Sequence, residues 1–142
     1  MTEFEHITTD AAVKTYEAAI GVFGAILNEV RELSRKKPDA TLSKNKVKLI
    51  NNVLSDLMSI LKGEPEEKYL QILEDDDLPQ VSDALMMMVQ FDAALSSFRE
   101  RYRKYIKSGQ YTGDHYWITK ELLEEWETEE AELGEEDGEN QE

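Results

Sequence analysis

The chain has 142 residues, a formal net charge of −15 and no cysteine. Its length favours one domain with a single hydrophobic core, and the lack of cysteine excludes disulfides and cysteine-bound metals. No apolar run approaches the roughly 18 residues of a membrane span, so we expect a cytoplasmic protein with no membrane partner. The excess of negative charge argues against direct binding of nucleic acid, which depends on cationic groups.

The negative charge is concentrated at the end of the chain. Residues 1–120 contain 19 acidic and 16 basic residues, whereas residues 121–142 contain 12 acidic residues and no basic one. The last nine residues also lack apolar side chains, and such a segment cannot offset the entropy lost on ordering. We therefore expect a single helical domain over residues 1–133 and a disordered acidic tail over residues 134–142.

Apolar side chains recur every three or four residues near the start of the chain, which is the period of a helix with one buried face. This first helix is expected to run from about Asp10 to Lys37, because Pro38 cannot continue it. Gly21 and Gly24 interrupt the pattern. We interpret them as positions where a neighbouring backbone passes close to the helix.

A second periodic stretch begins near Ser43 and ends at Gly63, where glycine favours a left-handed cap. The short connection between the two helices predicts an antiparallel hairpin. A short helix is expected after Pro65, since proline and acidic residues suit a first turn. The acidic run that follows lacks the ligand spacing of a calcium loop, and we interpret Asp77 as the N-cap of the next helix.

The most regular periodicity follows and predicts a long helix that ends at Ser108-Gly109. Near its beginning the helix is apolar on every side, so it must be covered by its own bundle or by another molecule. Methionine adapts its shape to different partners. We therefore take Met86, Met87 and Val89 as a candidate partner-binding patch, and a homodimer is one way to cover it.

A last helix is predicted to begin at Asp114 and to lose its apolar face after Trp126. The expected fold class is all-α, an antiparallel helical bundle of four main helices plus one short helix, with the disordered acidic tail. If the three longest helices before Asp114 run up, down and up, their basic residues meet at one end. This basic pole would consist of Lys44, Lys46, Lys48, Arg99 and Arg103, and it would receive an anionic group or the tail itself.

No constellation of catalytic residues stands out, and we predict no catalytic residue, no cofactor and no metal. The sequence contains two histidines, His6 and His115. Helical ribonucleases of toxin and defence systems place an arginine shortly before a histidine on a late helix, whereas here Arg103 precedes His115 by twelve residues. A ribonuclease-like protein or a toxin–antitoxin component is kept as an alternative.

The sequence thus predicts a non-catalytic module that binds a protein partner and regulates or inhibits it, with acidic charge steering the association. In the alternative hypothesis, helical acids one turn apart, roughly 6 Å, imitate DNA for a basic nucleic-acid-binding protein. In composition the chain is similar to acidic phage proteins that inhibit defence enzymes in this way. The candidate acidic surface comprises Glu121, Glu124, Glu125, Glu129 and Glu132.

Overall fold

The computed structural model describes residues 4–139, and the chain divides into two compact units. Unit 2 is Lys14–Arg99, and unit 1 combines Met1–Val13 with Glu100–Glu142. The helices α1 (Asp10–Lys36) and α3 (Val81–Tyr102) contribute residues to both units. The described chain is mostly helical, as predicted; the departure from the all-α class is a small antiparallel sheet of two strands.

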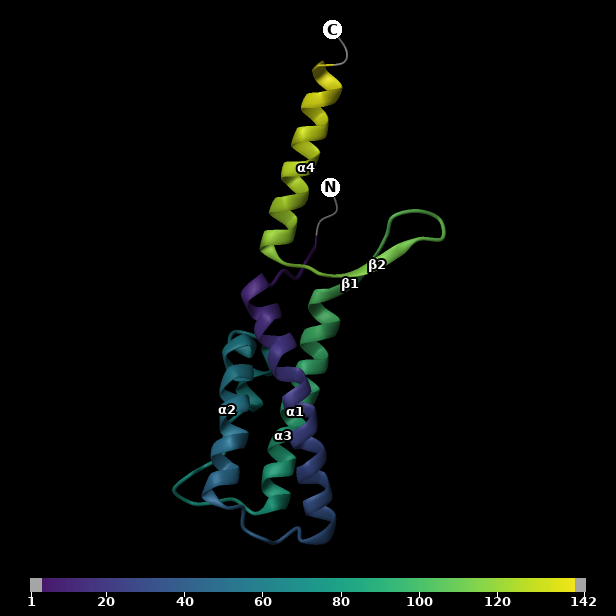
Figure 1. Ribbon diagram of the computed structural model, residues 1–142. Helices are drawn as coiled ribbons and strands as arrows, with labels where there is room; N and C mark the ends of the chain where they lie inside the picture. The colour runs from purple at the N-terminus through teal and green to yellow at the C-terminus, as the bar shows by residue number, and fades with distance from the viewer. Residues whose placement is uncertain (1–3, 140–142) are drawn as a thin grey trace. The chain divides into compact units, whose positions relative to one another are not determined.

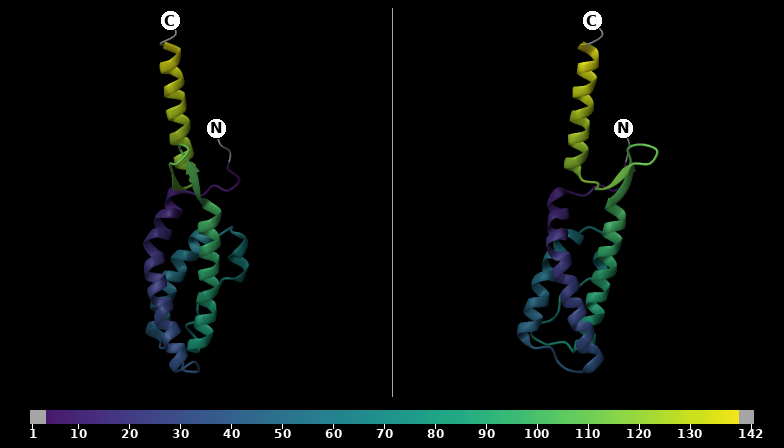
Figure 2. Two further views of the ribbon diagram at one scale, coloured as in Figure 1. Left: turned by 90° about the vertical axis from the view of Figure 1, so that its right-hand side faces the viewer. Right: turned by 45° about the vertical axis from the view of Figure 1, so that its right-hand side comes forward.

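Unit 2 contains three helices that lie side by side: α1, α2 (Lys44–Leu61) and α3 (Figures 1 and 2). The predicted limits of α2 are confirmed, because the Ser43 hydroxyl accepts the Lys46 N–H at 3.2 Å and Gly63 adopts a φ of 84° beyond its end. All three helices supply the core. Its largest fully buried side chains are those of Phe23, Leu54, Leu57, Leu61, Met88, Phe91, Leu95 and Phe98.

The segment between α2 and α3 runs back along unit 2, which periodicity did not reveal. It starts with the short helix predicted after Pro65, which is a 3-10 helix, η1 (Pro65–Tyr69). Beyond η1 the side chain of Asn51 in α2 donates to the carbonyl of Leu73 and accepts its N–H, both at 2.8 Å. These two bonds fasten the returning backbone to the middle of α2, and Leu70 and Leu73 are buried beside them.

At its end this segment pairs with the loop between α1 and α2. The Leu42 N–H donates to the carbonyl of Pro79 at 2.9 Å, and the Val81 N–H donates to the carbonyl of Ala40 at 2.8 Å. The helix α3 therefore begins next to the start of α2, and both helices run away from the loop. The predicted alternation of up, down and up is wrong for α3, and so is the N-cap at Asp77, since α3 starts four residues later.

The two glycines in α1 have open space around them, so the predicted close backbone approach is wrong. A Cβ atom built on Gly21 or Gly24 would meet no atom within 4 Å beyond the helix itself. Replacing both residues by alanine is expected to raise the free energy of unfolding by about 1 kcal/mol each, because glycine loses more backbone entropy in a helix. Chemical denaturation followed by circular dichroism measures the change.

Gly113 provides the opposite control for that experiment. A Cβ atom there would lie 2.6 Å from Cζ of Tyr105 and 2.7 Å from the carbonyl oxygen of Ile106. Gly113→Ala should therefore destabilise the protein while the two α1 variants stabilise it. A loss of stability in Gly21→Ala or Gly24→Ala would contradict the open surroundings of these positions.

Unit 1 contains the two strands, β1 (Arg103–Lys107) and β2 (Gly113–Trp117), and the helix α4 (Lys120–Glu139). The predicted continuation of the long helix to Ser108 is wrong, because the chain becomes β1 after Tyr102. The predicted cap at Asp114 is wrong as well, since Asp114 lies in β2. Thr119 caps α4 instead, and its hydroxyl accepts the Leu122 N–H at 3.1 Å.

The N-terminal segment of the chain pairs with the entrance to α4. Thr8 donates its N–H to the carbonyl of Ile118 and accepts the N–H of Lys120 at its own carbonyl, both at 2.9 Å. Ile118 and Thr119 are buried at this junction. Two segments far apart in the sequence thus fix where α4 begins.

The helix α4 extends further than the composition predicted. Residues 134–139 of the predicted disordered tail belong to it, and residues 140–142 lie outside the described part of the chain. Glutamate, alanine and leucine have high helix propensity, and a helix already nucleated at Thr119 gains one backbone bond for each added residue.

Candidate partner-binding groove

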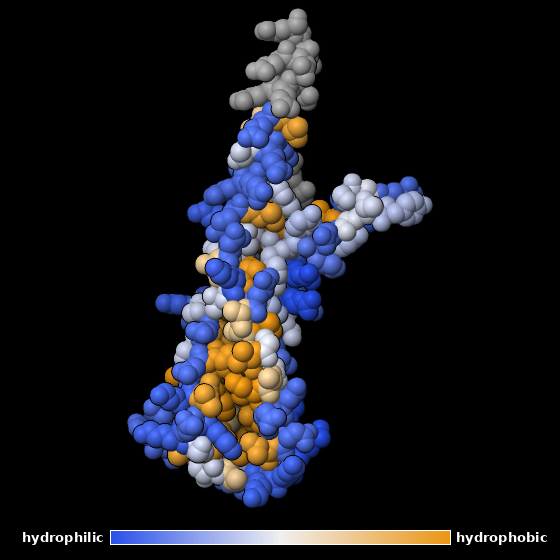
Figure 3. Space-filling view, in the orientation of Figure 1, coloured by the Kyte–Doolittle hydropathy of each residue, from blue (hydrophilic) through white to orange (hydrophobic). Residues whose placement is uncertain are grey.

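An apolar groove of about 870 Å³ lies between α1 and α2 in unit 2. Figure 3 shows apolar side chains gathered over these helices. Two large aliphatic side chains of the groove are exposed to solvent: Val22 is 54% exposed and Leu49 is 57% exposed. The groove is lined by Thr15, Ala18, Ala19, Val22, Ala25, Ile26, Glu29, Val30, Leu33, Leu42, Lys46, Leu49, Ile50, Asn52, Val53 and Asp56.

The groove exists because α1 carries a second apolar stripe beside the one that fills the core. The core stripe is buried and includes Phe23 and Leu27. The second stripe follows the helical period through Ala18, Val22, Ala25, Ile26 and Leu33, and Glu29 interrupts it. The small side chains of Ala18 and Ala25 leave the space above them open, so a hollow remains between α1 and α2 at these positions.

Charged groups stand at different places along the groove. Lys46 and Asp56 both line it from α2, and their ten-residue separation corresponds to about 15 Å along a helix. Glu29 contributes a further carboxylate from α1. The groove is therefore mainly apolar, with Lys46 and Asp56 on its α2 wall and Glu29 on its α1 wall.

The residues of the predicted basic pole are not gathered in one place. Lys44, Lys46 and Lys48 occupy the first turns of α2, next to the loop and to the beginning of α3. Arg99 lies eighteen residues beyond the start of α3, which corresponds to about 27 Å along that helix. Arg103 is the first residue of β1 and belongs to unit 1. A single basic pole of these five residues is thus wrong, because α3 runs away from the loop.

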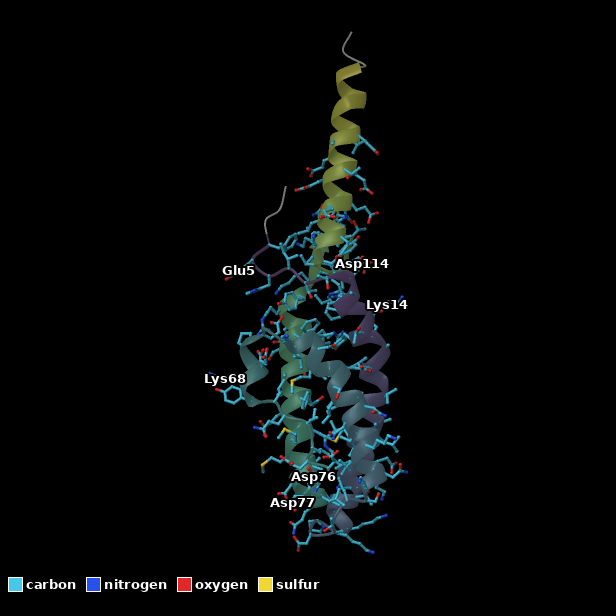
Figure 4. All side chains as sticks on the ribbon, turned by 90° about the vertical axis from the view of Figure 1, so that its left-hand side faces the viewer. Glu5, Lys14, Lys68, Asp76, Asp77 and Asp114 are labelled. Carbon is cyan, nitrogen blue, oxygen red and sulfur yellow. The ribbon has the colours of Figure 1, made fainter. Side chains whose placement is uncertain are left out.

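Acidic side chains share the loop end of unit 2 with these lysines. Figure 4 shows Asp76 and Asp77 there, close to the beginning of α3, while Lys68 lies on η1 further along the unit. Arg35 near the end of α1 forms an ion pair with Glu32 at 3.1 Å. The loop end is therefore mixed in charge.

The residues of the predicted apolar patch on α3 differ in exposure. Met86 is 68% exposed and Val89 is 42% exposed, whereas Met87 is only half-buried and Met88 is fully buried. None of these four residues lines the α1–α2 groove. Their part in partner binding stays a prediction.

The predicted acidic surface lies on α4, and one member has a structural contact. The carboxylate of Glu121 accepts the backbone N–H of Asp10 at 3.0 Å, where the first turn of α1 offers unpaired donors and a positive dipole end. The other four glutamates, Glu124, Glu125, Glu129 and Glu132, are exposed. Whether this surface binds a partner stays a prediction.

Metal sites and membrane spans are two further features that the described residues could contain. Between residues 4 and 139, no three histidine, aspartate or glutamate side chains come together as a metal site would require. Across the same residues, no helix is both long enough and apolar enough to cross a membrane. In comparisons with protein-family models, curated proteins and solved structures, nothing matched this chain.

Proposed function

We propose that this protein acts by binding another protein, and that the α1–α2 groove receives one amphipathic helix of that partner. The observation that carries the proposal is the groove itself, in which Val22 and Leu49 stand in water above a buried floor of Val30 and Ile50. Covering such a surface removes apolar area from water and is favourable by about 25 cal/mol per Å². Grooves between two helices are used in this way by other helix-binding proteins.

The charges along the groove define the partner helix further. Its apolar face should show side chains spaced by three and four residues, which enter the hollow above the α1 alanines. An acidic residue should face Lys46, and a basic residue about ten positions away should face Asp56. This pair would fix the direction of the helix, because the reversed helix would place like charges together. The proposal includes a regulatory role in the cytoplasm. The chain has no cysteine, and disulfide bonds are typical of proteins in oxidising compartments.

A pair of synthetic peptides tests this proposal. Both have about 18 residues, matching the length of α1 that lines the groove, and both carry the same leucine stripe. One places glutamate to face Lys46 and lysine to face Asp56, and its control exchanges the two charged residues. Titration into isotopically labelled protein should shift the amide resonances of Val22, Ile26, Leu49 and Val53 at lower concentration for the first peptide.

The location of the shifts decides the outcome. Shifts confined to α1 and α2, with the charge-matched peptide binding more tightly, support a helix-binding groove. Shifts centred on Met86 and Val89 would overturn the proposal and assign binding to the patch on α3. Equal affinity for the two peptides would remove the charge argument.

One observation favours imitation of DNA as a second candidate function. The acids of α4 from Glu121 to Glu132 lie on one continuous helix and follow the helical period. After Lys120 this helix contains no basic residue, and its glutamates up to Glu132 are exposed. A basic nucleic-acid-binding protein that meets such an array would be displaced from it by duplex DNA and by salt. Competition between duplex DNA and this chain for such a protein tests the idea.

A further inference from the structure

The β1–β2 hairpin has two unlike faces. The strands pair Arg103 with Trp117, Tyr105 with His115 and Lys107 with Gly113. Alternate residues of a strand point to opposite sides, and paired residues share a side. One side of the hairpin therefore combines two cations with three rings, and we call it the ring face: Arg103, Tyr105, Lys107, His115 and Trp117.

The rings on this face are held in place by the strands. Tyr105 and His115 meet edge to face with their centroids 5.2 Å apart. The ring of Tyr105 also covers Gly113, where a Cβ atom would lie 2.6 Å from its Cζ. Tyr105 is 52% exposed even so, and Tyr111 in the loop between the strands is 91% exposed. Aromatic surface is thus offered to solvent next to Lys107.

The opposite side of the hairpin faces the acidic helix. Tyr116, adjacent to His115 in β2 and so on the other side, packs edge to face against Trp126 of α4 at 5.5 Å between centroids. Lys104, its partner across the strands, donates from Nζ to the carbonyl of Glu100 at 2.9 Å. The hairpin therefore contacts α4 through the side that carries Lys104 and Tyr116, which is opposite the ring face. The ring face is turned away from it.

The local charge of this segment is opposite to that of the whole chain. Residues 99–117 contain five lysines and arginines and two acidic residues, in a chain of net charge −15. Exposed rings beside cations are the two components with which proteins hold single-stranded nucleic acid, since unpaired bases stack on rings and cations track the phosphates. Paired bases present no such stacking surface.

We propose that the ring face of the hairpin, together with Tyr111 in the loop between the strands, binds single-stranded nucleic acid. Bases stack on Tyr105, His115 and Tyr111, while Lys107 and Arg103 lie beside the phosphates. From the net charge of −15 alone, the chain is predicted not to bind nucleic acid. Binding at the locally basic hairpin is therefore weak and sensitive to salt. The glutamates of α4 oppose it, so their removal strengthens it. This site is independent of the α1–α2 groove.

Fluorescence anisotropy of a labelled oligothymidylate of about 15 nucleotides, titrated with the full chain at low salt, tests the proposal. Tyr105→Leu is expected to weaken binding about 10-fold, the loss of roughly one stacked base. Tyr69→Leu is the matched control, because Tyr69 is 60% exposed on η1 in unit 2, and it should change the affinity less than about twofold. Lys107→Gln should reduce the slope of affinity against salt by about one.

A second variant covers the case in which Tyr105→Leu disturbs the hairpin. Tyr111 is almost fully exposed, so Tyr111→Ser leaves the strands intact and should still weaken binding several-fold. Replacing Glu124, Glu125, Glu129 and Glu132 by glutamine should strengthen it. The proposal is overturned if the oligonucleotide does not bind, if duplex DNA or polyglutamate competes as well as the single strand, or if Tyr111→Ser and Tyr69→Leu behave alike.

Discussion

Replacing Leu49 by glutamate is expected to weaken binding of the charge-matched peptide about 100-fold, because it removes a buried leucine contact and places a charge against an apolar surface. Leu49 is 57% exposed in the free chain, so the variant should fold normally and keep its free energy of unfolding within about 0.5 kcal/mol. Isothermal titration with the peptide gives the affinity, and chemical denaturation gives the stability. Together they separate loss of binding from loss of fold.

The same substitution on α3 is the control. Met86 is even more exposed than Leu49, at 68%, and it does not line the groove. Met86→Glu should therefore leave the peptide affinity within about twofold, as surface changes away from a contact do. If Met86→Glu abolished binding and Leu49→Glu did not, the predicted patch at Met86, Met87 and Val89 would be the binding surface, and the groove would have no part in it.

Phe91→Ala is expected to lower the free energy of unfolding by about 3 to 5 kcal/mol, the usual loss when a buried phenylalanine leaves a cavity. Phe91 is completely buried in α3. Proteins of this size are stable by only about 5 to 15 kcal/mol. The variant should therefore unfold at a much lower denaturant concentration, or be partly unfolded without denaturant. Far-ultraviolet circular dichroism measures the transition, because the described chain is mostly helical.

Two further substitutions in α3 serve as comparisons for Phe91→Ala. Val89→Ala removes an aliphatic side chain that is 42% exposed, and it should cost clearly less than Phe91→Ala. Phe91→Leu keeps most of the buried volume and should recover much of the stability. A loss below about 1 kcal/mol for Phe91→Ala would mean that the core of unit 2 collapses readily around the missing ring, contrary to its close packing.

Helices with one strong apolar stripe could be predicted from the sequence, whereas the path between them could not. Ser43 and Gly63 fixed the ends of α2 because cap chemistry is local. The direction of α3 depends on hydrogen bonds between Leu42 and Pro79 and between Ala40 and Val81. Nothing in periodicity reports such bonds, so the return of residues 70–80 along unit 2 could not be predicted.

The α1–α2 groove and the ring face of the hairpin were not predicted, for different reasons. The groove depends on residues outside the core stripes, such as Val22 and Leu49, and they matter only because α1 and α2 lie together. The hairpin did leave a signal: two short runs rich in tyrosine, with a glycine-containing loop between them. Tyr105 continues the helical spacing of Phe98 and Tyr102, so the periodicity predicts helix up to the turn.

The closure of unit 1 by the two ends of the chain has a consequence for synthesis on the ribosome. Asp10 and Glu121 are hydrogen-bonded although 111 positions separate them, and Thr8 pairs with Ile118 beside them. At about 5 to 20 residues per second, Thr8 and Asp10 are synthesised roughly 5 to 20 seconds before Ile118 and Glu121, with which they form hydrogen bonds. Unit 2, whose residues are contiguous, is complete well before then. Nascent chains should therefore acquire the three-helix core first, while residues 8–10 stay accessible to proteases and chaperones until residues 118–121 emerge.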